Sequence, residues 1–200
     1  MYLIFTYIII FAFWALYRYY TNYSIFIDEV LAKPVLWVGP AIIASIIKRL
    51  NFKLLEIKRI AFKSIVLSII AGIGLVLLQL IPIHLKNPAS LNLPSNLLVL
   101  MISLVFTAFS EEILFRGFFY KQFQKFYPAI LSNILVSFLF FIIHLPVLIF
   151  DQNIVSAGLL SSFPSLFVSS FTFGFLYSYT KSLWSPIVAH FIMDFFLFFS

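Results

Sequence analysis

Long runs of consecutive apolar residues, separated by short polar segments, dominate the chain. Strands of a membrane barrel alternate apolar and polar residues, so uninterrupted apolar runs predict membrane-spanning helices instead. Hydropathy predicts about seven such helices. They cover about residues 2–16, 30–47, 60–83, 93–124, 128–150, 163–179 and 184–199. The predicted fold class is therefore all-α, a polytopic membrane helical bundle.

Three of the predicted helices are short for a bilayer, which takes about 20 apolar residues to cross. They are the first, the second and the seventh, and the second also contains Pro34 and Gly39-Pro40. Six spans, seven spans or a bundle with one re-entrant segment all agree with this pattern. The first run lacks the basic start and the cleavage site of a signal peptide, so we expect a retained helix.

Composition supports a membrane location. Hydrophobic residues make up 63% of the chain and charged residues only 10%, whereas a soluble domain has about 25% charged residues. These values exclude a soluble enzyme, a disordered tail and a fibrous repeat. The absence of cysteine excludes disulfides, cysteine-ligated metal and a cysteine nucleophile. No repeat or linker is visible, so we expect one integral membrane domain over residues 1–200, with its motifs within about 94–199.

Basic residues concentrate in alternate loops of the predicted bundle. The loops after the second, fourth and sixth spans hold Lys48, Arg49, Lys53, Lys58, Arg59, Lys63, Lys121, Lys125 and Lys181. The opposite loops hold Arg18, Lys33 and Lys86. By the positive-inside rule, the N-terminus and the basic loops face the cytoplasm. The basic run after the second span then predicts contact with lipid headgroups, so we expect membrane lipid, and not nucleic acid, as a partner.

Six ionisable residues lie in or beside apolar runs where a span is normally free of them. They are Glu111, Glu112, Arg116, His144, His190 and Asp194. One charge at the middle of a membrane helix costs about 2.5–3.5 kcal/mol. The two glutamates, the arginine and the aspartate, if unpaired, would together cost on the order of 10 kcal/mol, which is comparable with the stability of a whole fold. These side chains must therefore face one another or a hydrated cavity, which indicates a functional site.

The spacing of these residues predicts specific pairs. Glu112 and Arg116 are four residues apart, so they share a helix face and can form an ion pair. Glu111 points about 100° away from Glu112, which excludes a carboxylate dyad with a shared proton and leaves Glu111 free for chemistry. His190 and Asp194 are also four residues apart, so Asp194 is expected to fix the histidine's tautomer or to support its charge.

Depth along the helices gives a further expectation. Glu111 lies roughly 20 Å from the cytoplasmic end of its helix, and His144 lies roughly 24 Å from the start of the next one. His190 is only about 9 Å beyond Trp184. Either residues 182–186 enter the protein, or the last helix begins elsewhere than predicted.

The chemistry open to this set is hydrolysis. The chain has no H-E-x-x-H zinc motif and no G-x-S-x-G elbow. A glutamate with a histidine can activate a water, and a second histidine with its neighbour can stabilise an oxyanion, which together suggest cleavage of an amide. The alternative is one Zn²⁺ with an open coordination position. Its ligands would be Glu111, His144, His190 and Asp194.

Three motifs in this order resemble the CPBP family of membrane proteases. Glu111-Glu112-Ile113-Leu114-Phe115-Arg116 fits E-E-x-x-x-R, Phe140-Phe141-Ile142-Ile143-His144 fits F-x-x-x-H, and His190-Phe191-Ile192-Met193-Asp194 fits H-x-x-x-N/D. The family includes the type II CAAX prenyl endopeptidases and the abortive-infection-type proteases of bacteriocin processing and self-immunity. The resemblance covers residues 97–198, half of the chain.

The resemblance implies an intramembrane endopeptidase. Carried over by position, Glu111 and His144 would activate the attacking water, and His190 with Asp194 would bind the oxyanion. Glu112 and Arg116 would orient the site. Asp194 stands where many members have asparagine, so it must be protonated, act through His190 or bind a metal. We expect glutamate-dependent hydrolysis without a cofactor, with a zinc enzyme as the alternative.

Two other functions compete with a protease. A non-catalytic membrane protein of bacteriocin self-immunity would bind a peptide, and its phenotype would survive substitution of all three catalytic candidates. A small transporter would show its carboxylates open to both membrane faces, because intramembrane charges also mark ion pathways. The short chain, rich in Phe, Ile and Lys, is typical of a bacterial plasma membrane protein. We therefore expect a membrane-associated or leader-type peptide as substrate rather than a prenylated protein.

Overall fold

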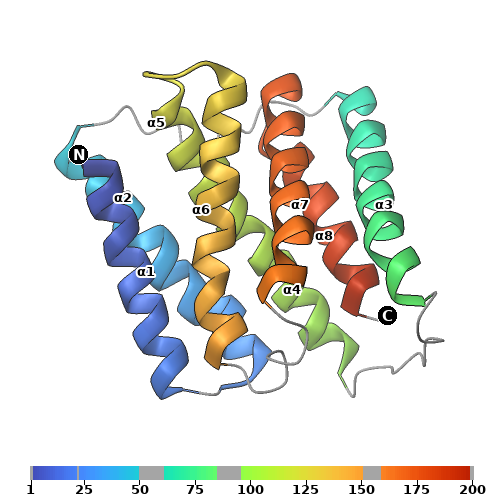
Figure 1. Ribbon diagram of the computed structural model, residues 1–200, viewed down its shortest axis with the longest axis horizontal. Coiled ribbons are helices and arrows are strands. Elements are labelled where there is room, and N and C mark those ends of the chain that lie inside the picture. The colour runs from blue at the N-terminus through green and yellow to red at the C-terminus, as the bar shows by residue number, and fades with distance from the viewer. Residues whose placement is uncertain (1, 22, 50–60, 85–95, 151–158, 199–200) are drawn as a thin grey trace.

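The computed structural model describes residues 2–21, 23–49, 61–84, 96–150 and 159–198. All regular elements within these ranges are helices, and none of the described residues forms a strand (Figure 1), which confirms the predicted all-α class. Five helical segments are long and apolar enough to cross a membrane. The chain is accordingly an integral membrane protein.

Seven helical segments follow one another in the described residues, one for each predicted run. Two of them combine α-helix with the wider π-helix, written η. In order, they are α1 (Tyr2–Tyr20); η1 (Ile27–Ala32) with η2 (Pro34–Val38) and α2 (Gly39–Ile47); α3 (Phe62–His84); α4 (Leu97–Glu112) with η3 (Ile113–Tyr120) and α5 (Lys121–Phe123); α6 (Ala129–Phe150); α7 (Leu159–Thr180); and α8 (Trp184–Phe198).

Of the three helices predicted to be short, the first and second are longer than expected, and the last is as short as expected. The first segment has 19 residues and the second has 21, so both can cross a bilayer. The last, α8, has only 15. Its start is nevertheless deep, because Ser182, Leu183 and Ser185 are all buried. The segment before α8 therefore enters the protein, which is the first of the two predicted alternatives and explains how a short helix carries His190 into the core.

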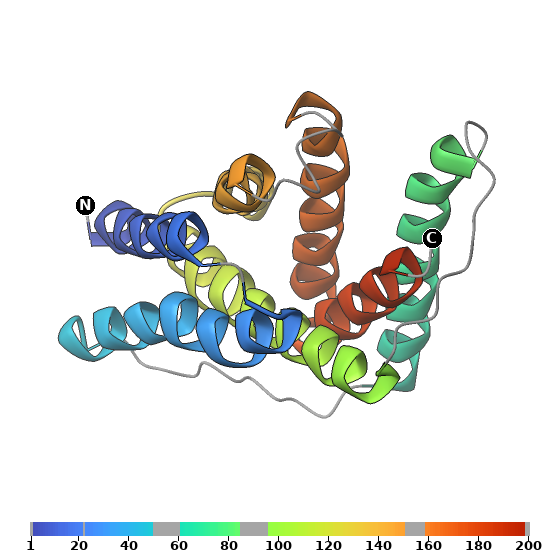
Figure 2. The ribbon, with the colours of Figure 1, turned by 90° about the horizontal axis from the view of Figure 1, so that it is seen from below.

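The two central helical elements are α4 and α8. α8 contacts α3, α4 and α7, and α4 also contacts η1 and η2 of the second segment. α6 contacts α1 and α7 (Figures 1 and 2). The helices that carry the sequence motifs are thus in contact, α4 with α8 and η3 with α6, and the second segment packs against α4.

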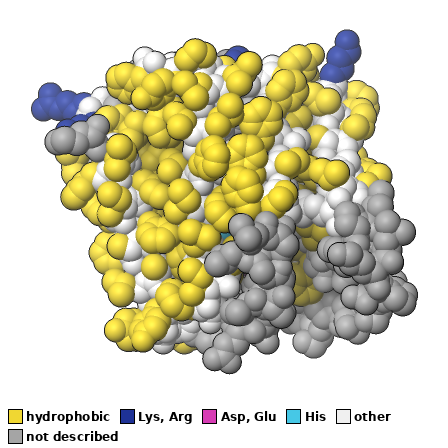
Figure 3. Space-filling model, in the orientation of Figure 1, with side chains coloured by type: hydrophobic (Ala, Val, Ile, Leu, Met, Phe, Trp, Pro, Cys, Tyr) yellow, Lys and Arg dark blue, Asp and Glu magenta, His cyan; other side chains and the backbone are white. Residues whose placement is uncertain are grey.

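The outer surface is almost entirely apolar in the view of Figure 3. Lys and Arg side chains appear there only along the upper edge of the view, from the side of α1 to the side of α3, and no acidic side chain is visible on this face. Exposed residues of α1 such as Ile4, Phe5 and Ile8 present hydrocarbon to the surroundings. A face of this kind suits contact with lipid, whose core offers no partner to a polar group.

Candidate active site

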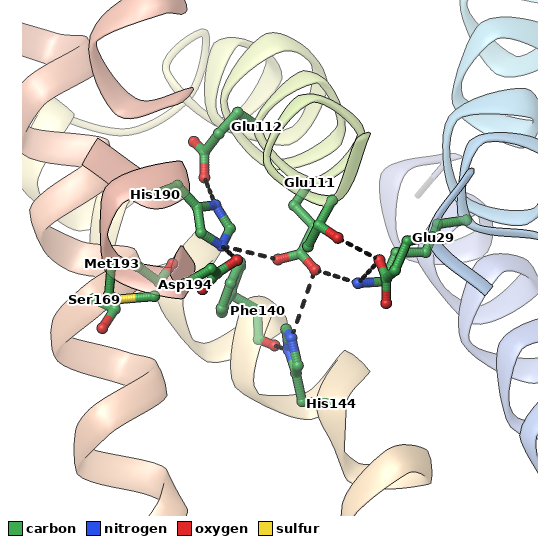
Figure 4. Close-up of polar contacts among 12 residues, drawn as sticks. Glu29, Glu111, Glu112, Phe140, His144, Ser169, His190, Met193 and Asp194 are labelled. Atoms are coloured by element: carbon green, nitrogen blue, oxygen red, sulfur yellow. Dashed lines mark hydrogen bonds and ion pairs between the residues drawn. The ribbon is translucent and has the colours of Figure 1, made fainter. Parts of the chain in front are cut away.

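Six ionisable side chains from four helical elements gather at one place in the bundle. Figure 4 labels all of them except Arg116. α4 supplies two glutamates, η3 an arginine, α6 a histidine, and α8 a histidine and an aspartate. They are the six residues that the sequence predicts: Glu111, Glu112, Arg116, His144, His190 and Asp194. The structure brings all of them into one network of contacts.

Glu112 and Arg116 form the fully buried part of the site. Arg116 Nη1 donates to Glu112 Oε1 at 2.9 Å, the contact that their spacing predicts. Arg116 Nη2 donates to the backbone carbonyl of Ser170 and, at 2.6 Å, to its hydroxyl. The guanidinium also faces the rings of Phe140 and Phe173, 5.4 and 5.6 Å from their centroids. Arg116 therefore connects the α4–η3 segment to α7.

His190 lies between two carboxylates. Its Nδ1 is 3.0 Å from Glu112 Oε1, and its Nε2 is 3.3 Å from Asp194 Oδ2. Phe173 stacks on the imidazole with ring centroids 4.6 Å apart. The predicted contact with Asp194 is present, and Glu112 adds a second one on the other nitrogen. With Nδ1 bonded to Glu112, the Nε2 atom is the one turned toward Glu111.

Glu111 lies between the two histidines and is only 1% exposed. Its Oε1 is 3.8 Å from His144 Nε2, and its Oε2 is 3.8 Å from His190 Nε2. Hydrogen bonds between N and O usually span about 2.7–3.2 Å, so neither contact is a direct one. A separation of this size allows one small group, such as a water, to bond to both partners.

His144 turns its Nε2 toward Glu111 because its other nitrogen has a partner. Nδ1 lies 2.6 Å from the carbonyl oxygen of Phe140, one turn earlier in α6. A carbonyl only accepts, so Nδ1 is assigned the proton, and a neutral ring then has its lone pair on Nε2. The side chains of His144 and Asp194 are each 20% exposed. The site is therefore accessible from outside the bundle at these two residues.

A further span contributes to the site, and the sequence interpretation missed it. Lys33 lies between η1 and η2 within the second segment, not in a loop as predicted, and is buried. Its ammonium is 2.7 Å from Glu111 Oε1 and 2.6 Å from Glu29 Oε2. Glu29 in turn accepts a hydrogen bond of 2.7 Å from Thr107 of α4. Glu111 is therefore separate from the pair of Glu112 with Arg116, as expected, but it has an ion pair with Lys33 that the sequence interpretation did not include.

The sequence does hold a signal for the pair of Glu29 and Lys33. Glu29 and Lys33 are four residues apart at the edge of an apolar run, the same pattern that identified Glu112 with Arg116. Assigning Lys33 to a loop concealed it. Trp37, whose ring meets that of His144 edge-on at 6.1 Å, offers no comparable signal. Aromatic residues are common in spans, so only the three-dimensional arrangement distinguishes this one.

The arrangement of donors does not fit a zinc ion. An ion bound to Glu111 would lie beside the Lys33 ammonium, which is 2.7 Å from Glu111 Oε1, and two cations so close repel each other strongly. Over the described residues, no group of three or more His, Asp or Glu side chains is arranged to hold a metal.

Comparison with protein families gives a match that includes all six residues. The model of the type II CAAX prenyl endopeptidase Rce1-like family matches residues 93–196, which is more than half of the 200 residues. The chain belongs to this family. At the level of the family it is a CAAX-type intramembrane endopeptidase. A search of the curated proteins gives no match.

The Rce1-like match agrees with the resemblance recognised from the three motifs. It begins before α4 and ends within α8, so it contains the glutamates, the arginine, both histidines and Asp194. Glu29 and Lys33 lie outside it. The contact between Lys33 and Glu111 thus joins the matched segment to a part of the chain that the family model does not cover.

Proposed function

We propose that this protein hydrolyses a peptide bond of a membrane-associated peptide with a water activated by Glu111 and His144. The observation that carries the proposal is the position of the Glu111 carboxylate, 3.8 Å from an imidazole nitrogen on each side. This arrangement offers a base for a water on one side and a hydrogen-bond donor for an oxyanion on the other.

The attacking water binds between Glu111 and the lone pair of His144 Nε2. A water at about 2.8 Å from both atoms spans the observed gap of 3.8 Å. Glu111 accepts one proton of the water while its oxygen attacks the carbonyl carbon of the scissile bond. His144 orients the water because its Nδ1–H is fixed on the Phe140 carbonyl.

The oxyanion of the tetrahedral intermediate accepts a hydrogen bond from His190. Glu112 accepts from Nδ1–H of this ring, and Asp194 lies beside Nε2, so the two carboxylates favour an imidazolium that is protonated on both nitrogens. Its Nε2–H faces the space next to Glu111. Asp194, 3.3 Å from Nε2, acts through His190 rather than as a donor of its own, since an ionised carboxylate only accepts. Glu111 then passes its proton to the leaving nitrogen, the C–N bond breaks, and an acid and an amine are released.

The substrate we propose is a leader-type or membrane-anchored peptide in a bacterial plasma membrane. The composition supports a bacterial source, and the concentration of basic residues supports an N-terminus in the cytoplasm. Partial exposure of His144 and Asp194 supports entry of an extended chain to the site. The family name also makes a farnesylated CAAX peptide a necessary second probe.

The test is cleavage of peptides by purified protein in liposomes, followed by mass spectrometry. Probes are a farnesylated CAAX peptide, its unprenylated counterpart and a leader-type peptide library. Glu111→Gln, His144→Ala and His190→Ala should each abolish cleavage while the protein still folds. His84→Ala is the matched control, since it removes the remaining histidine, at the end of α3, and should cleave normally.

Normal cleavage by Glu111→Gln would rule out the mechanism. The same assay with a chelator separates the metal-free mechanism from the zinc alternative. We expect the wild-type rate to persist after chelation. A rate that is lost with the chelator and returns with Zn²⁺ would overturn the metal-free mechanism while leaving the peptidase activity in place.

A further inference from the structure

The second helical segment carries a buried cation that the proposed mechanism has not used. Lys33 is 6% exposed although it lies inside a span of 21 residues, as the seventh of them. A charge at this depth is costly unless it is paired, and intramembrane charges of this kind usually serve a function. Both of its ion-pair contacts are carboxylates, one from its own segment and one from α4.

These contacts form a closed ring between two helical segments. Glu29 and Lys33 are four residues apart in the second segment, and Thr107 and Glu111 are four residues apart in α4. Thr107 donates to Glu29 at one end of the ring, and Lys33 donates to Glu111 at the other. Each pair therefore presents one face to the other, which fixes the position of Lys33 relative to α4.

Neutralising Lys33 does not by itself require Glu111. The 2.6 Å contact with Glu29 already supplies one carboxylate for one ammonium. The second carboxylate is the catalytic candidate, and Lys33 contacts only its Oε1. Glu111 Oε2 has no hydrogen-bond partner among the described side chains and main-chain groups. The contact thus distinguishes the two oxygens of one carboxylate.

We propose that Lys33 is a positioning residue for Glu111, which it holds by Oε1 so that the carboxylate meets the attacking water in one fixed orientation. The inference rests on the proposed function. Trp37 packs against both groups, because its ring centroid lies 5.1 Å from Lys33 Nζ and its ring meets that of His144 edge-on. The active site then needs the N-terminal helices, although the family match starts only at residue 93.

Kinetics of charge-neutral variants test the proposal. Glu29→Gln keeps the ammonium on Glu111 and should retain most of kcat. Glu29→Gln combined with Lys33→Met removes one charge of each sign, so the protein should fold, but Glu111 loses its partner. We expect kcat to fall by about 10–100-fold, the usual effect of losing a residue that orients a catalytic ligand, with KM unchanged.

Two further variants separate positioning from bulk charge. Lys33→Arg should recover part of the kcat that Lys33→Met loses, because a guanidinium also donates to a carboxylate. Lys48→Met removes the same charge at the end of the same segment, where the ammonium faces the Tyr2 ring, and should cleave normally. A rise in KM with unchanged kcat in the Lys33 variants would mean that Lys33 binds substrate, and would overturn the proposal.

A thermal double-mutant cycle gives a readout that needs no substrate. Lys33→Met leaves Glu111 buried without its ammonium, so adding Glu111→Gln to it should raise the melting temperature again. If the decreases in melting temperature of the two single variants simply add in the double variant, the two side chains are not coupled and the proposal fails. If wild-type protein cleaves no probe but the cycle shows coupling, the proposed function fails while Lys33 is confirmed as the partner that holds Glu111.

Discussion

Arg116 offers the sharpest test of the buried part of the site. Methionine at this position keeps much of the apolar volume but removes the charge and all the donors. Glu112, which has no exposed surface, would then lose its 2.9 Å ion pair. The carbonyl and hydroxyl of Ser170 would lose their donor as well. Removing one partner of a buried ion pair costs about 3–5 kcal/mol, and we expect a loss in that range for Arg116→Met.

The assay is thermal unfolding of the purified variants in one detergent. A loss of this size corresponds to a melting temperature lower by roughly 6–20 °C for a chain of this length. Arg116→Met with Glu112→Gln removes both charges and should melt above the single variant. Arg116→Lys should recover only part of the loss, because an ammonium lacks the fork that reaches both Glu112 and Ser170. The reasoning would be refuted if Arg116→Met melted at the wild-type temperature, or if the double variant were less stable than Arg116→Met alone.

Two other substitutions have defined outcomes. Gly174→Ala should lower the melting temperature by overpacking, at a cost of about 1–3 kcal/mol. The added Cβ would lie 1.7 Å from Oδ1 of Asn133. The Asn133 side chain is held in place, because its amide donates to a backbone carbonyl of α7. Gly74→Ala has no atom within 4 Å of its added carbon and is the control; equal melting of both variants would contradict the close contact. Asp194→Asn should keep cleavage activity, since Glu112 still holds His190 and an amide N–H can itself donate to the oxyanion, whereas Asp194→Ala should lose it. An asparagine variant as inactive as the alanine variant would show that the carboxylate charge is required.

Contacts within one helix were predictable from the sequence. The pairs Glu112 with Arg116 and His190 with Asp194 follow from helical periodicity alone, and both are present. The all-α class was equally predictable, because lipid allows few other solutions for consecutive apolar residues. The depth argument for the last helix left two alternatives open, and the burial of Ser182, Leu183 and Ser185 favours the one in which the segment before α8 enters the protein.

Contacts between helices were not predictable in the same way. Most spans here are apolar on every side, so sequence periodicity does not tell which face meets which neighbour. The bond of Glu112 to His190 depends on α8 packing against α4. Lys33, which bonds to Glu111, lies between two π-helices of the second segment, and the residue pattern did not predict their wider turns. Such π segments often occur at functional sites.

Adjacent glutamates explain how one turn of α4 serves two purposes. Because the side chains of Glu111 and Glu112 point in different directions, Glu112 can be enclosed with Arg116 while Glu111 faces the histidines. His190 touches both systems, with Nδ1 on Glu112 and Nε2 facing Glu111. The buried ion pair therefore does more than stabilise the bundle, since it fixes which nitrogen of His190 faces the reaction. A substitution at Arg116 should then disturb catalysis through His190, whereas one at Lys33 should act on Glu111 directly.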